Sequence, residues 1–230
     1  MICFFALVYL LLANFFKLYY LQKSTSSNRI QYHSIIHCVL AFLYTSFLFL
    51  IKERKESFDT DYYLLLYTKS NDILYDIAIY HSIGYFLADT FDILLDYTNT
   101  KRRIYLLHHG SAIVGLSIIY WGSYIPVYPI WALEMGGIVH HLKNLSEMRE
   151  IKDNDIFDQI LKHKIVYQLL YHVVYLFSRI LLTINVYKCL IHISLSRNPL
   201  PDLLGLTVVC VLIVQNIIWW FKNVSQHFRV

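Results

Sequence analysis

Six ionisable side chains interrupt two apolar segments between residues 80 and 116. The first segment carries His81, Asp89, Asp92 and Asp96, and the second carries the adjacent pair His108-His109. An ionisable group at membrane depth costs free energy, so such groups face the interior of a helical bundle or a water-filled cavity. On an α-helix the first four residues fall near one face, because they are separated by eight, three and four positions. We therefore expect the chemistry of the protein to lie in these two segments.

A neutral histidine beside a carboxylate acts as a general base in a water-poor cavity, because the carboxylate fixes its tautomer. That chemistry suits acyl transfer from acyl-CoA to an amine or hydroxyl of a lipid, or an acyl intermediate on the histidine itself. We predict His108, His109 and Asp89 as catalytic residues, with His81 as a weaker candidate. The two adjacent rings project about 100° apart, so we expect one to line the cavity and the other to contact a neighbouring helix. The alternative is structural: these groups cap helix ends or bond between helices. This applies above all to Asp96, which is close to the expected basic turn at residues 101–103.

Paired histidines support a rival hypothesis, a di-metal oxidase or hydroxylase. The pairs are His33-x-x-x-His37, His108-His109 and His140-His141. They resemble the histidine boxes of membrane fatty-acid desaturases and hydroxylases, which use HxxHH, but Tyr105 and Gly137 stand where that motif needs histidine. A metal site needs enough convergent ligands, and we predict none here.

Two further charges lie within apolar segments. Glu134 is in the middle of one, where it either bonds to a neighbouring helix or lines the cavity. Arg179 needs a counter-charge, since an unpaired guanidinium in hydrocarbon is costly, and Asp89, Asp92 and Glu134 are the available acids. We predict Glu134, Arg179, His81 and Asp92 as residues that line the cavity or contact lipid.

Other polar and aromatic residues suit the ends of membrane helices. His140-His141 precede a charged stretch, and we expect their rings to be solvated at the interface. Trp219-Trp220 are expected to belong to an interfacial aromatic belt. The four cysteines lie far apart in apolar runs, which predicts small buried side chains and no disulfide framework.

The composition excludes an ordinary soluble domain. Of 230 residues, 57% are hydrophobic and 16% are charged, whereas soluble domains have about 45–50% apolar and about 25% charged residues. Seven glycines and four prolines, together with continuous apolar runs, favour helices over a transmembrane barrel. No basic patch interleaved with exposed aromatics indicates nucleic-acid binding. The sequence predicts an all-α, multi-pass membrane protein.

Seven apolar segments are near the length of about 20 residues that a helix needs to cross a bilayer. They cover residues 2–21, 33–50, 76–95, 104–121, 126–142, 165–193 and 203–221. We interpret the first as a retained helix, because no positively charged region or cleavage site marks a signal peptide. Thirteen of the 20 Lys and Arg residues follow the odd-numbered segments, and six follow the even-numbered ones. The positive-inside rule then predicts a lumenal N-terminus and a cytosolic C-terminus.

Five regions of the chain share their order with a known family. They are YHSIIHCVLAF, YFLADTFDIL, LLHHGSAIV, WALEMGGIVHHLKNL, and VYLFSRILL followed by QNIIWWFKNV. Together they resemble the TLC family of helical membrane proteins, which includes the ceramide synthases; the similarity is greatest to its small members. The resemblance implies a six-helix bundle around a lipid-sized cavity, an additional N-terminal helix and an endoplasmic-reticulum membrane. Its domains would be residues 1–29, the N-terminal helix and loop; 30–225, the TLC domain; and 226–230, a short cytosolic tail.

The resemblance also carries residue roles. The family's paired histidine falls on His108-His109, its third-helix aspartate on Asp89, its fifth-helix acid on Glu134 and its sixth-helix arginine on Arg179. Ceramide synthases place a further His-Asp and another Asp after the histidine pair, whereas residues 110–133 of this chain contain no ionisable side chain except tyrosine.

Two functions follow from these expectations. One is N-acyl transfer like that of ceramide synthases, with acyl-CoA as substrate and no cofactor. The other is non-enzymatic lipid sensing or transport that adjusts membrane lipid composition, which the missing acids favour. Membrane lipids are the expected partners in both, and the oligomeric state is left open.

Overall fold

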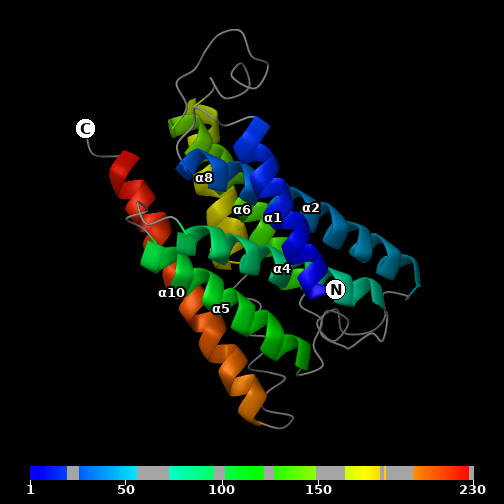
Figure 1. The fold of residues 1–230 in the computed structure, drawn as a ribbon. Helices are drawn as coiled ribbons and strands as arrows, with labels where there is room; N and C mark the ends of the chain where they lie inside the picture. The colour runs from blue at the N-terminus through cyan, green and yellow to red at the C-terminus, as the bar shows by residue number, and fades with distance from the viewer. Residues whose placement is uncertain are drawn as a thin grey trace.

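The computed structural model describes residues 1–19, 26–55, 73–95, 102–121, 127–148, 164–181, 184 and 199–227. The elements in these ranges are all helices, which pack into one bundle (Figure 1). They are α1 (Ile2–Tyr19), α2 (Ser26–Lys55), α4 (Ile73–Leu95), α5 (Arg102–Trp121), α6 (Val127–Met148), α8 (Lys164–Tyr175) with the π-helical segment η1 (Leu176–Leu181), and α10 (Pro199–His227). The all-α prediction is confirmed for these ranges.

The helices lie where the seven apolar segments were predicted, but several are longer. α2 begins within the polar stretch before residue 33, α6 continues to Met148, and α10 runs from Pro199 to His227. Hydropathy marks membrane depth, whereas backbone hydrogen bonding continues a helix into polar sequence, so the two boundaries differ. The C-terminal part of the predicted segment 165–193 lies outside the described residues, except residue 184. Within them, Leu206–Ser225 is the one stretch that is long and apolar enough by itself to cross a membrane, and Ile2–Phe15 and Tyr32–Leu48 are shorter apolar helices.

Contacts between helices fix their relative directions. α2 and α4 are antiparallel, since Ser34 bonds to Tyr85 while Tyr44 bonds to the carbonyl of Leu74. Contacts that join early residues of one helix to late residues of another also make α6 antiparallel to α2 and to α8. By the same criterion α10 is antiparallel to α5 and to α8. α1 runs parallel to α4. The chain therefore reverses direction at each successive helix.

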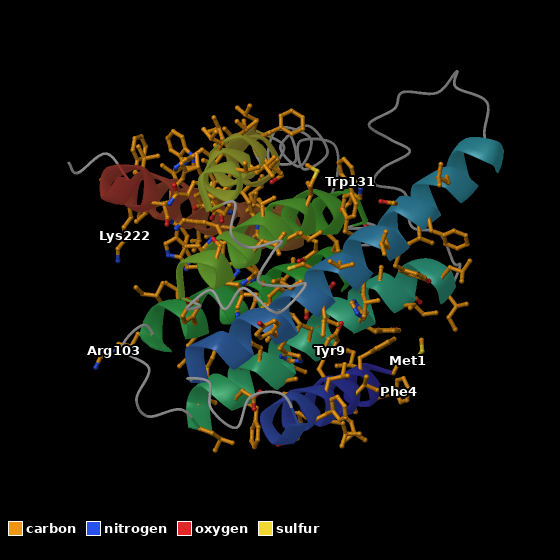
Figure 2. All side chains as sticks on the ribbon, turned by 90° about the horizontal axis from the view of Figure 1, so that it is seen from above. Met1, Phe4, Tyr9, Arg103, Trp131 and Lys222 are labelled. Atoms are coloured by element: carbon orange, nitrogen blue, oxygen red, sulfur yellow. The ribbon has the colours of Figure 1, made fainter. Side chains whose placement is uncertain are left out.

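The bundle has polar groups inside and apolar groups outside. His37, Asp89, Glu134, Lys143 and Arg179 are buried among apolar side chains. Large apolar side chains are exposed in stripes with helical spacing, as in Phe4, Leu7, Leu11 and Phe15 of α1 and Leu40, Leu43, Phe47 and Leu50 of α2. Figure 2 shows Phe4 on the outer side of α1. Among the described side chains every helix except α6 has such exposed residues, so α6 is the inner helix of the bundle.

α1 packs tightly against α4 at Gly84. A Cβ atom at this position would lie 2.6 Å from Cβ of Phe5, 2.9 Å from the backbone nitrogen of Ala6 and 3.1 Å from the carbonyl oxygen of Ile2. Two of these three neighbours are backbone atoms, which cannot swing aside as a side chain can. The approach of α1 to the bundle therefore depends on a residue without a side chain.

We expect Gly84→Ala to lower the thermal stability of the purified protein in detergent. The added methyl must push α1 away from α4, and overpacking of this kind costs about 1–3 kcal/mol. The matched control is Gly110→Ala on α5, where a Cβ would meet nothing within 4 Å and the better helix propensity of alanine stabilises by up to about 1 kcal/mol. Thermal unfolding curves that shift equally for both variants would contradict this packing.

Candidate functional site

A partly open cavity of about 110 Å³ lies between α2, α4, α5, α6, η1 and α10. Its wall combines apolar side chains, including Leu116, Ile130 and Leu212, with most of the buried ionisable groups of the bundle. A single water molecule needs about 10–15 Å³ of such cavity volume, so the space holds several waters or a length of hydrocarbon chain. This cavity therefore brings ionisable side chains next to an apolar wall that suits a hydrocarbon ligand.

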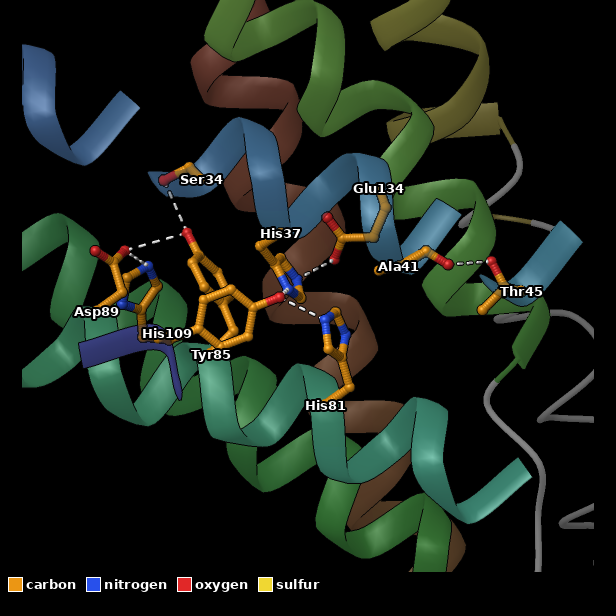
Figure 3. Close-up of polar contacts among 10 residues, drawn as sticks. Ser34, His37, Ala41, Thr45, His81, Tyr85, Asp89, His109 and Glu134 are labelled. Carbon is orange, nitrogen blue, oxygen red and sulfur yellow. Dashed lines mark hydrogen bonds and ion pairs between the residues drawn. The ribbon is translucent and has the colours of Figure 1, made fainter. Parts of the chain in front are cut away.

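Asp89 of α4 and His109 of α5 form an acid–histidine pair on the cavity wall (Figure 3). Oδ2 of Asp89 lies 3.3 Å from Nε2 of His109 and also accepts a bond of 3.3 Å from the hydroxyl of Tyr85. Ser34 of α2 bonds to that same hydroxyl at 2.8 Å and so anchors Tyr85. Both members of the pair are almost fully buried, with 2% and 4% of their surfaces exposed.

The partners of His109 determine its tautomer. A carboxylate only accepts, so Nε2 carries the proton that is donated to Asp89. Nδ1 is then the lone-pair atom, and among the described residues it accepts from the hydroxyl of Thr90 at 3.4 Å, a long hydrogen bond. Oδ1 of Asp89 is buried and has no partner among the described residues. The pair thus keeps one basic nitrogen engaged only by a long bond, and one acceptor oxygen without a partner among the described residues.

His108 also lines the cavity, which corrects the expectation that only one ring of the pair would do so. Its ring lies 5.1 Å from Trp219 of α10 and 6.2 Å from Phe86 of α4, and its Nδ1 has no partner among the described residues. The two rings differ in what orients them. An acid holds His109, whereas aromatic packing surrounds His108.

A second acid–histidine pair joins α6 to α2. Oε1 of Glu134 lies 3.3 Å from Nε2 of His37, and Nδ1 of His37 lies 3.3 Å from the hydroxyl of Tyr9 on α1. The same hydroxyl bonds to Nε2 of His81 on α4, and the ring of His37 stacks on Tyr85 at 3.7 Å (Figure 3). Glu134 lies on the cavity wall, whereas Tyr9 and His37 lie behind it. This polar chain therefore supports the cavity from the side of α1.

Arg179 lines the cavity from η1, but the predicted acid partner is wrong. Glu134 pairs with His37 and Asp89 pairs with His109, and no carboxylate of the described residues lies within 4 Å of the guanidinium. A π-helical turn places Ser178, Arg179 and Ile180 toward the interior. π-Helical turns are rare overall, and those that do occur are often found at functional sites.

The structure corrects the expectation for the second histidine pair. His140 and His141 line the cavity and are not simply solvated at an interface, and the ring of His140 stacks on that of Trp219 at 6.2 Å. α6 continues past the predicted end of its segment, which keeps both histidines inside the bundle. Trp219 also lines the cavity and Trp220 packs on His172 and Phe221, while their place in an interfacial aromatic belt stays a prediction.

The other predicted site residues lie apart from the cavity wall. His81 belongs to the polar chain with Tyr9 and His37, and neither it nor Asp92 is among the described residues that line the cavity. Both are half-buried on α4. Asp96 falls outside the described residues.

Reasoning from sequence missed the residues that hold the predicted ones in place. Tyr85 bonds to Asp89, and His37 holds Glu134 from 97 positions away in the chain. The spacing His33-x-x-x-His37 places both rings on one helix face but gives no sign that His37 pairs with Glu134. No three His, Cys, Asp or Glu side chains in the described ranges converge closely enough to hold a metal ion.

Comparisons of the chain with protein-family models, with curated proteins and with solved structures find no match.

Proposed function

We propose that this chain is a multi-pass membrane protein of seven spans that holds a lipid or acyl chain in its helical bundle. Two observations support the membrane setting. Successive helices alternate in direction, as they do in a chain that crosses a bilayer repeatedly. The outer surface is apolar while ionisable groups are buried, which inverts the usual arrangement of a soluble protein and matches a bundle in hydrocarbon.

Several cations lie at one end of the bundle, and this supports our assignment of that end to the cytosol. Arg103 at the start of α5 and Lys222 near the end of α10 lie on the same side in Figure 2, and Trp131 lies toward the other side. Lys143 belongs with them, because its Nζ donates to Oδ1 of Asn223 at 2.6 Å. With the positive-inside rule this gives a lumenal N-terminus and a cytosolic C-terminus, and we propose the endoplasmic reticulum as the membrane.

We expect the native sequons at Asn144 and Asn223 to remain without glycans. Both match Asn-x-Ser, but both lie on the proposed cytosolic side, and the amide of Asn223 already bonds to Tyr171 and to the carbonyl of Trp219. The measurement is the electrophoretic mobility of the cell-expressed protein with and without endoglycosidase. A sequon introduced between residues 56 and 72, on the proposed lumenal side, should gain a glycan as the control. A glycan on native Asn144 would reverse the orientation.

The activity we propose is acyl transfer from acyl-CoA to an amine or hydroxyl of a lipid acceptor. The Asp89–His109 pair on the wall of an apolar cavity carries this proposal. The acceptor's N–H or O–H would donate to Nδ1 of His109 as its nitrogen or oxygen attacks the thioester carbonyl. The new C–N or C–O bond replaces the C–S bond, and the imidazolium returns the proton to the departing thiolate. Asp89 stabilises that imidazolium and keeps the ring oriented.

The test of this activity uses the purified wild-type protein in detergent with acyl-CoA. Release of free CoA is measured with long-chain amine and hydroxyl lipids as acceptors, and the acylated product is identified by mass spectrometry. Acceptor-dependent CoA release with matching acyl-lipid product supports the proposal. No product above a heat-inactivated control, from protein that is folded and binds lipid, overturns the enzymatic part.

A non-enzymatic lipid-handling protein is the second candidate, and one observation favours it. Beyond His109, α5 presents Ala112, Gly115 and Leu116 to the cavity, and residues 110–133 contain no side chain that is charged near neutral pH. This half of the cavity suits binding of a hydrocarbon chain and supplies no further catalytic group. Comparison of lipid profiles from cells with and without the protein separates the candidates: changed phospholipid chains without turnover in vitro support lipid handling.

A further inference from the structure

Arg179 is a buried cation on the cavity wall, and no carboxylate of the described residues pairs with it. Only 9% of its surface is exposed and it lies on the cavity wall. Its Nε atom has no hydrogen-bond partner, and no carboxylate oxygen of the described residues lies within 4 Å of its nitrogens. An uncompensated charge in such a setting costs several kcal/mol. The guanidinium is therefore a buried charge on the wall whose Nε donor is not used by the described residues.

The bundle is nevertheless shaped to hold this side chain in place. At Gly136 a Cβ atom would lie 2.5 Å from Cγ of Arg179 and 3.2 Å from Nε, and at Gly137 it would lie 2.9 Å from Nη2. Two adjacent glycines thus let the arginine lie directly against the backbone of α6. On its other side the guanidinium carbon is 5.9 Å from the ring centre of Tyr175, within the range of a cation–π contact. Packing, and not an ion pair, fixes its position.

The acids of the cavity are already engaged elsewhere. Glu134 lies on the same side of α6, where its Oε2 would be 3.4 Å from a Cβ atom at Gly137, but its Oε1 is held by His37. Asp89 is held by His109 and Tyr85. Glu134 offsets part of the positive field of Arg179 at a distance, but Nε of the guanidinium still has no acceptor among the described residues.

We propose that the cavity binds an anionic amphiphile, whose carboxylate or phosphate bonds to the guanidinium of Arg179. Its hydrocarbon chain would lie against the apolar wall formed by Leu116, Val208 and Leu212. A planar guanidinium presents two parallel N–H donors that match the two oxygens of either anion, and burial strengthens the attraction. This inference rests on the proposal that the cavity holds a lipid, and it adds the charge and the orientation of that lipid.

Native mass spectrometry of the full-length protein, released from detergent after incubation with one lipid at a time, tests the inference. The probes are oleate, 1-oleoyl lysophosphatidate and 1-oleoylglycerol, which share one hydrocarbon chain and differ in their head groups. We expect at least one of the two anions to be retained about tenfold more than 1-oleoylglycerol, a difference of about 1.4 kcal/mol. Which anion is retained identifies the head group as carboxylate or phosphate.

Variants locate the effect. Arg179→Gln should remove the preference for the anion. Arg179→Lys should keep part of it, because the lysine ammonium retains the positive charge but lacks the paired N–H donors of the guanidinium. The matched control is Lys222→Gln, which removes an exposed cation from α10 and should keep the full preference.

Three results would overturn the inference. Equal retention of all three lipids by the wild type would remove the anion site while leaving a lipid-binding cavity. An anion preference that survives in a folded Arg179→Gln protein would move the site elsewhere. Retention of none of the three lipids would overturn the lipid-binding proposal as well. If Arg179→Gln does not fold, the wild-type comparison of the three probes still decides.

Discussion

His109→Asn is expected to lower acyl transfer per folded molecule by about 10²–10⁴-fold, the usual contribution of a positioned general base. Asparagine can replace the bond to Asp89, so the protein should still fold, but its amide cannot accept the acceptor's proton. Asp89→Asn should produce a comparable loss, because an amide can donate to the ring and favour the wrong tautomer. The measurements are CoA release by purified protein and the cellular lipid profile, both normalised to folded protein.

Two other variants show whether such a loss is specific. His108→Asn removes a ring that lines the cavity but has no acid partner, so its effect should be smaller than that of His109→Asn. Ser46→Ala removes a bond to Trp131, 3.0 Å long, away from the cavity wall, and should keep full activity. If His109→Asn and Asp89→Asn both match the wild type, the pair is structural and the enzymatic proposal fails.

His37→Leu should produce the largest loss of stability. It leaves Glu134 buried without the histidine that bonds to it at 3.3 Å, and removal of one partner from a buried pair costs about 3–5 kcal/mol. For a chain of this length that cost lowers the Tm by roughly 6–20 °C. Thermal unfolding in detergent, followed by circular dichroism, measures the shift.

The control for this prediction is Thr45→Val on the same helix. Thr45 is equally buried, but its hydroxyl bonds only to the carbonyls of Ala41 and Phe42 in its own turn (Figure 3), so its loss should be small. Glu134→Gln added to His37→Leu should recover part of the lost stability, since no buried charge is then left unpaired. Strictly additive shifts would show that the two residues do not act as a pair.

The positions of the helices and one of the acid–histidine pairs were predictable from the sequence. Long apolar runs separated by polar residues locate each helix, because a helix that crosses a bilayer needs about 20 predominantly apolar residues. Asp89 and His109 lie on helices that follow each other closely in the chain, so their approach follows from antiparallel packing of α4 and α5. Their contact at 3.3 Å matches the expected partnership, while their catalytic role stays a prediction.

The residues that hold the site in place were not predictable, because they make contacts between helices that are far apart in the sequence. His37 meets Glu134 across 97 positions, and Tyr9 meets His81 across 72, so no local spacing signals either contact. The neighbours of Arg179 depend on a π-helical turn and on the register of α6 against η1. Hydropathy predicts where each apolar helix lies in the sequence, but it does not predict which residues of two helices face each other.

Photo-crosslinking tests most directly whether the cavity holds an acyl chain. The purified protein is incubated with a fatty acid that carries a diazirine in its chain, irradiated and digested, and the labelled residues are identified by mass spectrometry. The account predicts label on the cavity wall, at Leu116 of α5 and Leu212 of α10, that excess unlabelled fatty acid removes. Label confined to outward side chains such as Phe4 and Ile218, and insensitive to competition, would contradict it.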